Sequence, residues 1–92
     1  MQNCSVIYVL SAEKKLYTLH RSAAKRIAKK IEQYSTLPNP LNEAKPLSGT
    51  LKGFYRYRVG DYRIIFSVDT GDVITVLTIF DIAHRKDVYR KG

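Results

Sequence analysis

Hydrophobic and polar positions along the first third of the chain follow two different periods. Residues 5–10 form a short run of β-branched and aromatic side chains, which predicts a mostly buried strand. Ser11 is then a candidate N-cap, and apolar residues at helical spacing predict a first helix over residues 12–20. Ser22 is a second candidate N-cap. From residue 23 to about residue 34, one apolar stripe recurs between lysines and arginines, which predicts an amphipathic helix.

The rest of the chain divides into a loop, three strands and a tail. Residues 35–51 contain all three prolines and predict a connecting loop, long enough to be functional or partly structured. Residues 54–59, 62–68 and 73–80 alternate like strands, and residues 81–92 form a polar tail with room for a short helix. The order predicts one α+β domain over residues 1–92, β-α-α-β-β-β, with two helices on one face of an antiparallel sheet.

The pair Gly60-Asp61 is typical of a two-residue hairpin turn and fixes how the strands on either side of it pair. Arg58 is then expected opposite Arg63, and strand alternation separates two faces. The core face is predicted to carry Tyr55, Tyr57, Val59, Tyr62, Ile64, Phe66 and Val68, extended by Val73, Thr75, Leu77 and Ile79. The other face is predicted to carry Phe54, Arg56, Arg58, Arg63, Ile65 and Ser67.

The three arginines on the second face suggest a binding role for it. The 92 residues include 16 Lys plus Arg and 8 Asp plus Glu, a formal net charge of +8, which suggests a polyanionic partner or simply solubility. Like charges opposite each other destabilise a sheet unless an anion lies over them, and the arginine fork matches phosphate oxygens. The cluster alone leaves three interpretations open: phosphate binding, an acidic protein partner, or a solvated basic face.

Cleavage of a phosphodiester also needs a group that transfers protons, which arginine does not do near neutral pH. His84, expected just beyond the third strand, is the titratable side chain placed to return over the end of the sheet. Tyr89 can stack on a base or donate a hydrogen bond. Taken singly, His84 is more often a surface histidine and Tyr89 a packing residue.

Several other classes are excluded. The single cysteine, Cys4, allows no internal disulfide and fits a reducing compartment. Cys4, His20 (expected at the end of the first helix) and His84 lack ligand spacing, so neither a metal nor a cofactor is predicted. Because no apolar run approaches the about 18 residues of a membrane span and no signal peptide is evident, we expect a cytoplasmic protein without a membrane partner.

The run from Leu51 to Arg90 resembles the RelE branch of the RelE/ParE superfamily of type II toxins. Its most specific parts are the string Tyr-Arg-x-Arg-x-Gly-Asp-Tyr-Arg and the tail His-Arg-x-x-Val-Tyr, and the lead-in Lys-Pro-Leu-x-Gly fits as well. The resemblance implies an mRNA interferase, a metal-independent endoribonuclease that cuts messenger RNA in the ribosomal decoding site. A ribose 2′-hydroxyl attacks the adjacent phosphate and leaves a 2′,3′-cyclic phosphate, and translation and growth stop.

Carried over by position, the family's basic residues fall on the arginine face. Arg56 matches a catalytic lysine, Arg58 a second basic residue, Arg63 the arginine after Gly-Asp-Tyr, and Tyr89 the tyrosine that orients the message. Further RNA or phosphate contacts are expected from Lys52, Arg85, Lys86, Lys25, Arg26, Lys29 and Lys30.

This chain departs from the family pattern at two of its positions. Arg56 does not act as a base in the way a lysine does, and Ala83 falls near a position where some members have another arginine. Relatives with the same tail suggest that His84 takes the acid or base role.

The resemblance also implies partners and leaves alternatives. The partners are an acidic RelB-like antitoxin and the ribosome with its messenger and ribosomal RNA. One alternative is a ParE-like toxin that inhibits DNA gyrase and has no nuclease activity. The other, raised by arginine in place of lysine at position 56, is a degenerate toxin that only binds its antitoxin.

Overall fold

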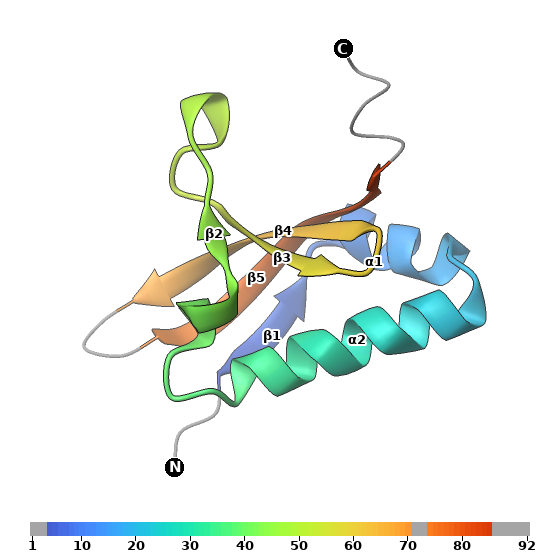
Figure 1. The fold of residues 1–92 in the computed structure, drawn as a ribbon, viewed down its shortest axis with the longest axis horizontal. Helices are drawn as coiled ribbons and strands as arrows, with labels where there is room; N and C mark the ends of the chain where they lie inside the picture. Colours follow the sequence, from blue (N-terminus) through green and yellow to red (C-terminus); the bar gives the residue numbers. More distant parts are fainter. Residues whose placement is uncertain (1–3, 71–73, 86–92) are drawn as a thin grey trace.

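A computed structural model describes residues 4–70 and 74–85. Its elements are β1 (Ser5–Tyr8), α1 (Leu10–Thr18), α2 (Arg21–Ser35), the 3-10 helix η1 (Pro40–Glu43), β2 (Lys45–Pro46), the 3-10 helix η2 (Gly49–Leu51), β3 (Tyr55–Val59), β4 (Tyr62–Thr70) and β5 (Ile74–His84), as drawn in Figure 1. They form one sheet in the order β1-β5-β4-β3-β2. The predicted α+β class is confirmed. The sheet is mixed rather than antiparallel throughout, because β1 pairs in parallel with β5.

Both helices begin earlier than their expected caps. Val9 is the N-cap of α1 and its carbonyl accepts from the Glu13 amide at 2.9 Å, so the expectation that Ser11 caps this helix is wrong. His20 is the N-cap of α2 and its side chain accepts from the Ser22 amide at 3.4 Å. Ser22 is therefore not the cap, and His20 does not belong to the end of α1, which stops at Thr18.

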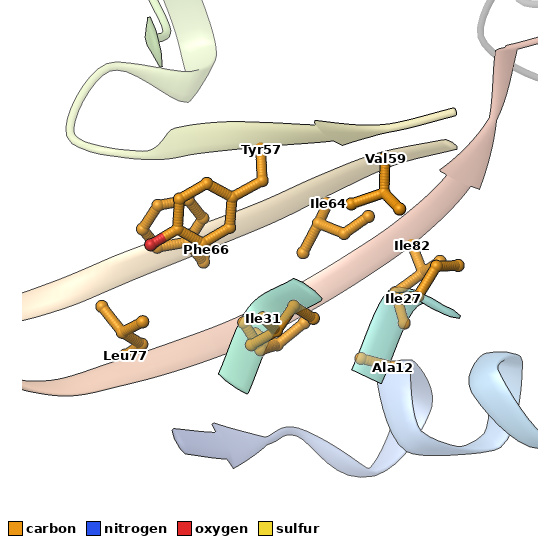
Figure 2. Close-up of a cluster of buried hydrophobic side chains, with 10 residues drawn as sticks. Ala12, Ile27, Ile31, Tyr57, Val59, Ile64, Phe66, Leu77 and Ile82 are labelled. Atoms are coloured by element: carbon orange, nitrogen blue, oxygen red, sulfur yellow. The ribbon is translucent and has the colours of Figure 1, made fainter. Parts of the chain in front are cut away.

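The core lies between the helices and one face of the sheet, as Figure 2 shows. Tyr57 and Phe66 stack at a centroid distance of 4.2 Å, and the Tyr57 hydroxyl donates to the Pro40 carbonyl at 2.8 Å. Burial accordingly raises the pKa of the Tyr57 hydroxyl. The buried cluster is Ala12, Ile27, Ile31, Tyr57, Val59, Ile64, Phe66, Leu77, Ile79 and Ile82. The predicted core face is confirmed for the described side chains, which do not include Val73 and Thr75.

The expectation of a mostly buried first strand is wrong for half of its residues. β1 is an edge strand, and only Val6 and Tyr8 share the register of the core residues Leu77 and Ile79. Ile7 pairs with Thr78 on the other face and is 51% exposed.

The third predicted strand continues through residues expected in the tail. Phe66 pairs with Ile79 while the preceding Ile65 pairs with Asp81, so β5 has one extra residue, Phe80, and the pair contains a β-bulge. Ile82 then returns to the core at 3% exposure. Burial of Ile82 explains why β5 extends to His84; the rest of the expected tail, with its short helix, lies outside the described residues.

The long predicted loop is partly structured. Asn39 caps η1 by accepting from the Leu41 amide at 3.0 Å, and Leu47 donates to the Phe54 carbonyl at 2.9 Å next to β2. β2 therefore adds a short antiparallel edge to β3, with Lys45 opposite Arg56. None of the helices in the described part of the chain is long and apolar enough to cross a membrane.

Candidate functional site

Three arginines, Arg56, Arg58 and Arg63, form the arginine cluster on the sheet face that the helices leave open. Arg58 pairs directly with Arg63, and Arg56 pairs with Ile65. This is the register predicted from the Gly60-Asp61 turn. Because alternate residues of the same strands are buried under the helices, the three guanidiniums lie on the opposite, open face.

The cluster concentrates positive charge. Burial lowers the pKa of the Arg56 guanidinium, and the charges of Arg58 and Arg63 lower it further. Arginine nevertheless stays protonated at working pH. None of the carboxylates in residues 4–70 and 74–85 forms an ion pair with the cluster. The face therefore holds mutually repelling cations that no described carboxylate neutralises through an ion pair, which favours the binding of an anion such as phosphate.

Lys45 extends the cluster onto β2 and was missed by the sequence analysis. It pairs with Arg56 and is exposed, so the register places its ammonium group on the arginine face. Because a strand of two residues has no measurable period, only the position of Lys45 in the Lys-Pro-Leu lead-in pointed to it.

His84 was expected just beyond the third predicted strand. The structure instead makes it the last residue of β5. It pairs with Tyr62, and their rings meet edge-on at a centroid distance of 5.0 Å. Tyr62 belongs to the helix-side face, whereas the neighbouring Ala83 pairs with Arg63. The register thus places His84 on the opposite face from the arginine cluster, at the end of the sheet.

Arg85 continues the pairing beyond His84. Its amide donates to the Asp61 carbonyl at 2.7 Å, which holds it beside the Gly60-Asp61 turn. Of the other tail residues predicted to contact RNA, Lys86 and Tyr89 lie outside the described residues.

The remaining predicted contacts form a second surface. Lys25, Arg26, Lys29 and Lys30 are exposed on α2, on the helix side of the sheet, and Lys52 is exposed after η2. The Arg26 guanidinium lies against the turn at Gly60, where an added Cβ would meet it at 2.8 Å. These α2 residues thus lie on the helix side of the sheet, and Arg26 reaches the turn that joins the strands of Arg58 and Arg63.

The described residues contain no group of three or more His, Cys, Asp and Glu side chains that could hold a metal ion. Cys4 has a local structural role instead, because its thiol donates to the Ile74 carbonyl at 3.1 Å. Burial raises the pKa of the Cys4 thiol, which makes it a weaker nucleophile.

Comparison with known proteins connects this arrangement to toxins. The family described as "ParE toxin of type II toxin-antitoxin system, parDE" matches residues 6–89. The chain is 38% identical over 52 residues to Toxin RelG of Mycobacterium tuberculosis, and the match spans 56% of this chain and 58% of that protein. The chain thus spans little more than half the length of that relative.

Two solved structures share the whole fold. One is the toxin-antitoxin complex RelBE2 from Mycobacterium tuberculosis, with a TM-score of 0.80 and 27% identity over 92% of this chain and 94% of the other. The second is the archaeal RelE-RelB complex from Pyrococcus horikoshii, with a TM-score of 0.69 and 26% identity over 91% of this chain and 97% of the other. Both structures contain a toxin bound to its antitoxin.

Proposed function

Since this chain belongs to the ParE toxin family of type II toxin-antitoxin systems, in its RelE branch, we propose that it stops translation by cutting ribosome-bound messenger RNA. The proposed activity is that of an endoribonuclease that uses no metal ion. Its substrate is the phosphodiester of a single strand held in the decoding site. The arginine cluster is the observation that supports this proposal most directly.

The proposed reaction is an internal transfer of the phosphoryl group. The ribose 2′-oxygen bonds to phosphorus while the bond from phosphorus to the 5′-oxygen breaks, leaving a 2′,3′-cyclic phosphate and a 5′-hydroxyl. Arg58 and Arg63, paired across the strands, stabilise the charge that develops on the phosphoryl oxygens. Arg56 holds the scissile or a neighbouring phosphate.

Two protons move in this reaction, one from the 2′-hydroxyl and one to the 5′-oxygen. We assign proton transfer to His84 and orientation of the message to Tyr89. Because His84 lies on the helix-side face beside Tyr62, proton transfer by His84 requires the scissile phosphate to lie at the end of the sheet, next to Arg63, whose partner Ala83 precedes His84. This geometry requires the message to pass the Gly60-Asp61 turn.

The second basic surface is proposed to dock ribosomal RNA through salt-sensitive backbone contacts. It consists of Lys25, Arg26, Lys29 and Lys30 on α2, on the side of the sheet away from the cluster, together with the exposed Lys14 of α1. Lys52, Arg85 and Lys86 are proposed to contact phosphates of the message. Docking and cleavage thus use opposite sides of one small domain.

The proposed inhibitor is an acidic, RelB-like antitoxin. The solved neighbours were captured with their antitoxins. The arginine cluster offers an acidic segment the same charge complementarity that it offers to phosphate. Binding there blocks the message by direct competition.

Cleavage of a defined message on programmed ribosomes tests the proposal. We expect wild type to cut and to leave a 2′,3′-cyclic phosphate. Arg63→Ala should slow the reaction about 10²- to 10³-fold, the usual cost of losing one charge-stabilising donor. Arg21→Ala, an exposed arginine on α2, is the matched control and should cut at the wild-type rate. Intact message with wild type, or equal rates for Arg63→Ala, would contradict the proposal.

The alternatives give different outcomes in parallel assays. A gyrase-inhibiting toxin leaves the message intact and blocks DNA supercoiling. A degenerate toxin leaves both processes intact, causes no growth arrest on expression, and still binds its antitoxin. Either pattern would replace the ribonuclease assignment.

A further inference from the structure

An aromatic pair, Phe54 and Phe80, lies on the open face of the sheet beside the arginine cluster. The two rings meet edge-on, with centroids 5.1 Å apart and planes at 89°. Phe54 directly precedes β3 and Phe80 belongs to β5, so the contact spans β4. Phe80 is 39% exposed.

The position of this pair is not explained by the core. The helices cover the other face, where Tyr57 and Phe66 are fully buried. On the open face, Ile65 lies in the strand between the two rings and is 9% exposed. Covering Ile65 uses only part of the surface of the two rings. The remaining ring surface of Phe80 faces solvent, although an aromatic ring gains most by burial.

The β-bulge of β5 is what brings Phe80 to this position. Phe80 is the extra residue between Ile79 and Asp81, opposite the step from Phe66 to Ile65. β-Bulges occur frequently next to functional sites, where they redirect a side chain. Here the bulge keeps Ile79 and Ile82 in the core and still presents a phenyl ring on the open face.

The spacing between the pair and the cluster suits a nucleotide. Phe54, directly before β3, precedes Arg56 by two residues, a separation of about 7 Å at the usual rise of an extended chain. A nucleotide whose phosphate lies on Arg56 has a base that reaches a neighbouring ring over such a span. Single-stranded RNA is commonly held in this way, by cations on the backbone and by aromatic rings against unstacked bases.

We propose that the Phe54–Phe80 pair is a nucleobase subsite that holds a base of the message next to the phosphate bound by the arginine cluster. This inference rests on the proposed function, because it takes single-stranded RNA as the ligand. Recognition by stacking tolerates every base, since each has a π-face. The subsite therefore positions the strand and leaves choice of sequence to other contacts.

The dependence of message cleavage on toxin concentration, measured with programmed ribosomes, tests the subsite. Phe80→Ala should raise the toxin concentration that gives half-maximal cleavage by about 5- to 150-fold, the range expected for one lost stacked base. The rate at saturation should change little. Phe80→Tyr keeps the ring and should retain wild-type behaviour. Tyr17→Ala, an aromatic residue 78% exposed on α1, is the matched control and should have no effect.

A message lacking one base gives a more specific test. Abasic sites placed in turn on either side of the cut should weaken cleavage by wild type at one position by the same factor as Phe80→Ala does. At that position Phe80→Ala should add no further loss, because base and ring act as one interaction. Additive losses at every position would overturn the subsite.

Other outcomes separate the subsite from the proposed function. If wild type cuts and Phe80→Ala cuts with the same concentration dependence, the subsite is wrong and the ribonuclease assignment stands. If that variant instead binds antitoxin more weakly, the pair is an antitoxin contact. If wild type does not cut, the ribonuclease assignment fails, and an RNA oligonucleotide containing 2-aminopurine tests the subsite: quenching by wild type that is lost in Phe80→Ala supports it, and equal quenching overturns it.

Discussion

The two faces of β3 and β4 are built from alternate residues of the same strands, yet one face is apolar and buried and the other is charged and exposed. On the helix side, Tyr57, Ile64 and Phe66 are fully buried and pack against α2. On the open side, Arg58 lies opposite Arg63, and Phe80 of the adjacent strand β5 is 39% exposed. The first face is what stability favours. The second contains a like-charge pair and an exposed aromatic, which stability does not explain and a polyanionic ligand does.

Substitution of a buried residue on the helix side should lower the stability of the fold strongly and leave the cleavage activity of the folded protein unchanged. Phe66→Ala should lower the free energy of unfolding by about 3–5 kcal/mol, because it removes a fully buried ring and leaves a cavity. Urea denaturation measures this change. Cleavage per folded molecule should stay close to wild type. A loss below about 1 kcal/mol would mean that the two faces do not differ in their contribution to the core.

Substitution of an arginine on the open side should have the opposite effect, a loss of cleavage without a loss of stability. Arg58→Ala should reduce cleavage about 10²-fold or more, because the guanidinium opposite Arg63 no longer stabilises the phosphoryl charge. The free energy of unfolding should stay equal or rise by some tenths of a kcal/mol, since a like-charge pair is removed. Arg58→Lys, which keeps the charge and loses the planar fork, is the control for geometry. A destabilised variant with normal cleavage would reverse the roles of the two faces.

The helix-side face was predictable because its signals are local. Alternation over residues 54–59 and 62–68 names the buried side chains, and a Gly-Asp turn of two residues permits one register. The same register placed the arginine cluster correctly. The positions of the charged residues and the alternation of the strands therefore sufficed to predict the part of the candidate site that lies on β3 and β4.

What the sequence concealed depends on non-local pairing. The bulge at Phe80 is one extra residue inside an apolar run, so nothing marks it before β5 meets β4. Unbroken alternation from Leu77 and Ile79 through Phe80 would put His84 on the arginine face, and the bulge at Phe80 moves His84 to the helix side. Lys45 was hidden for a similar reason, since β2 has two residues and exists only by pairing with β3.

A third prediction concerns the turn that joins the two strands. Gly60 has a φ of 60°, a left-handed conformation suited to the first position of a two-residue hairpin turn. Gly60→Ala should cost about 1–2 kcal/mol of unfolding free energy, measured by urea denaturation, because an L-residue is strained there. The clash with Arg26 adds little, since it involves the end of a flexible side chain. Asp61→Ala, at the neighbouring exposed position, should change stability by less than about 0.5 kcal/mol.

The edge of the open face provides a smaller, electrostatic test. If Lys45 contacts one phosphate beside Arg56, Lys45→Ala should lower the salt dependence of binding to a single-stranded RNA oligonucleotide. The slope of log K against log salt should fall by about 0.7, the value for one phosphate on a single strand. Fluorescence anisotropy over a series of salt concentrations measures it, with Arg21→Ala as the control. An unchanged slope would limit the anion site to the three arginines.

The smallest effect is expected where the open face borders α1. Asp81 pairs in register with Ile65 on that face, yet its carboxylate accepts from Lys15 of α1 at 2.7 Å. With the two side chains 51% and 45% exposed, water and salt screen the pair. Lys15→Met should therefore cost less than about 1 kcal/mol, and less still at high salt. The more informative measurement is phosphate or RNA binding by the same variant. If Lys15 also keeps the Asp81 carboxylate away from the arginine cluster, Lys15→Met should weaken anion binding more than it weakens the fold, whereas equal binding would leave the bridge as a surface contact alone.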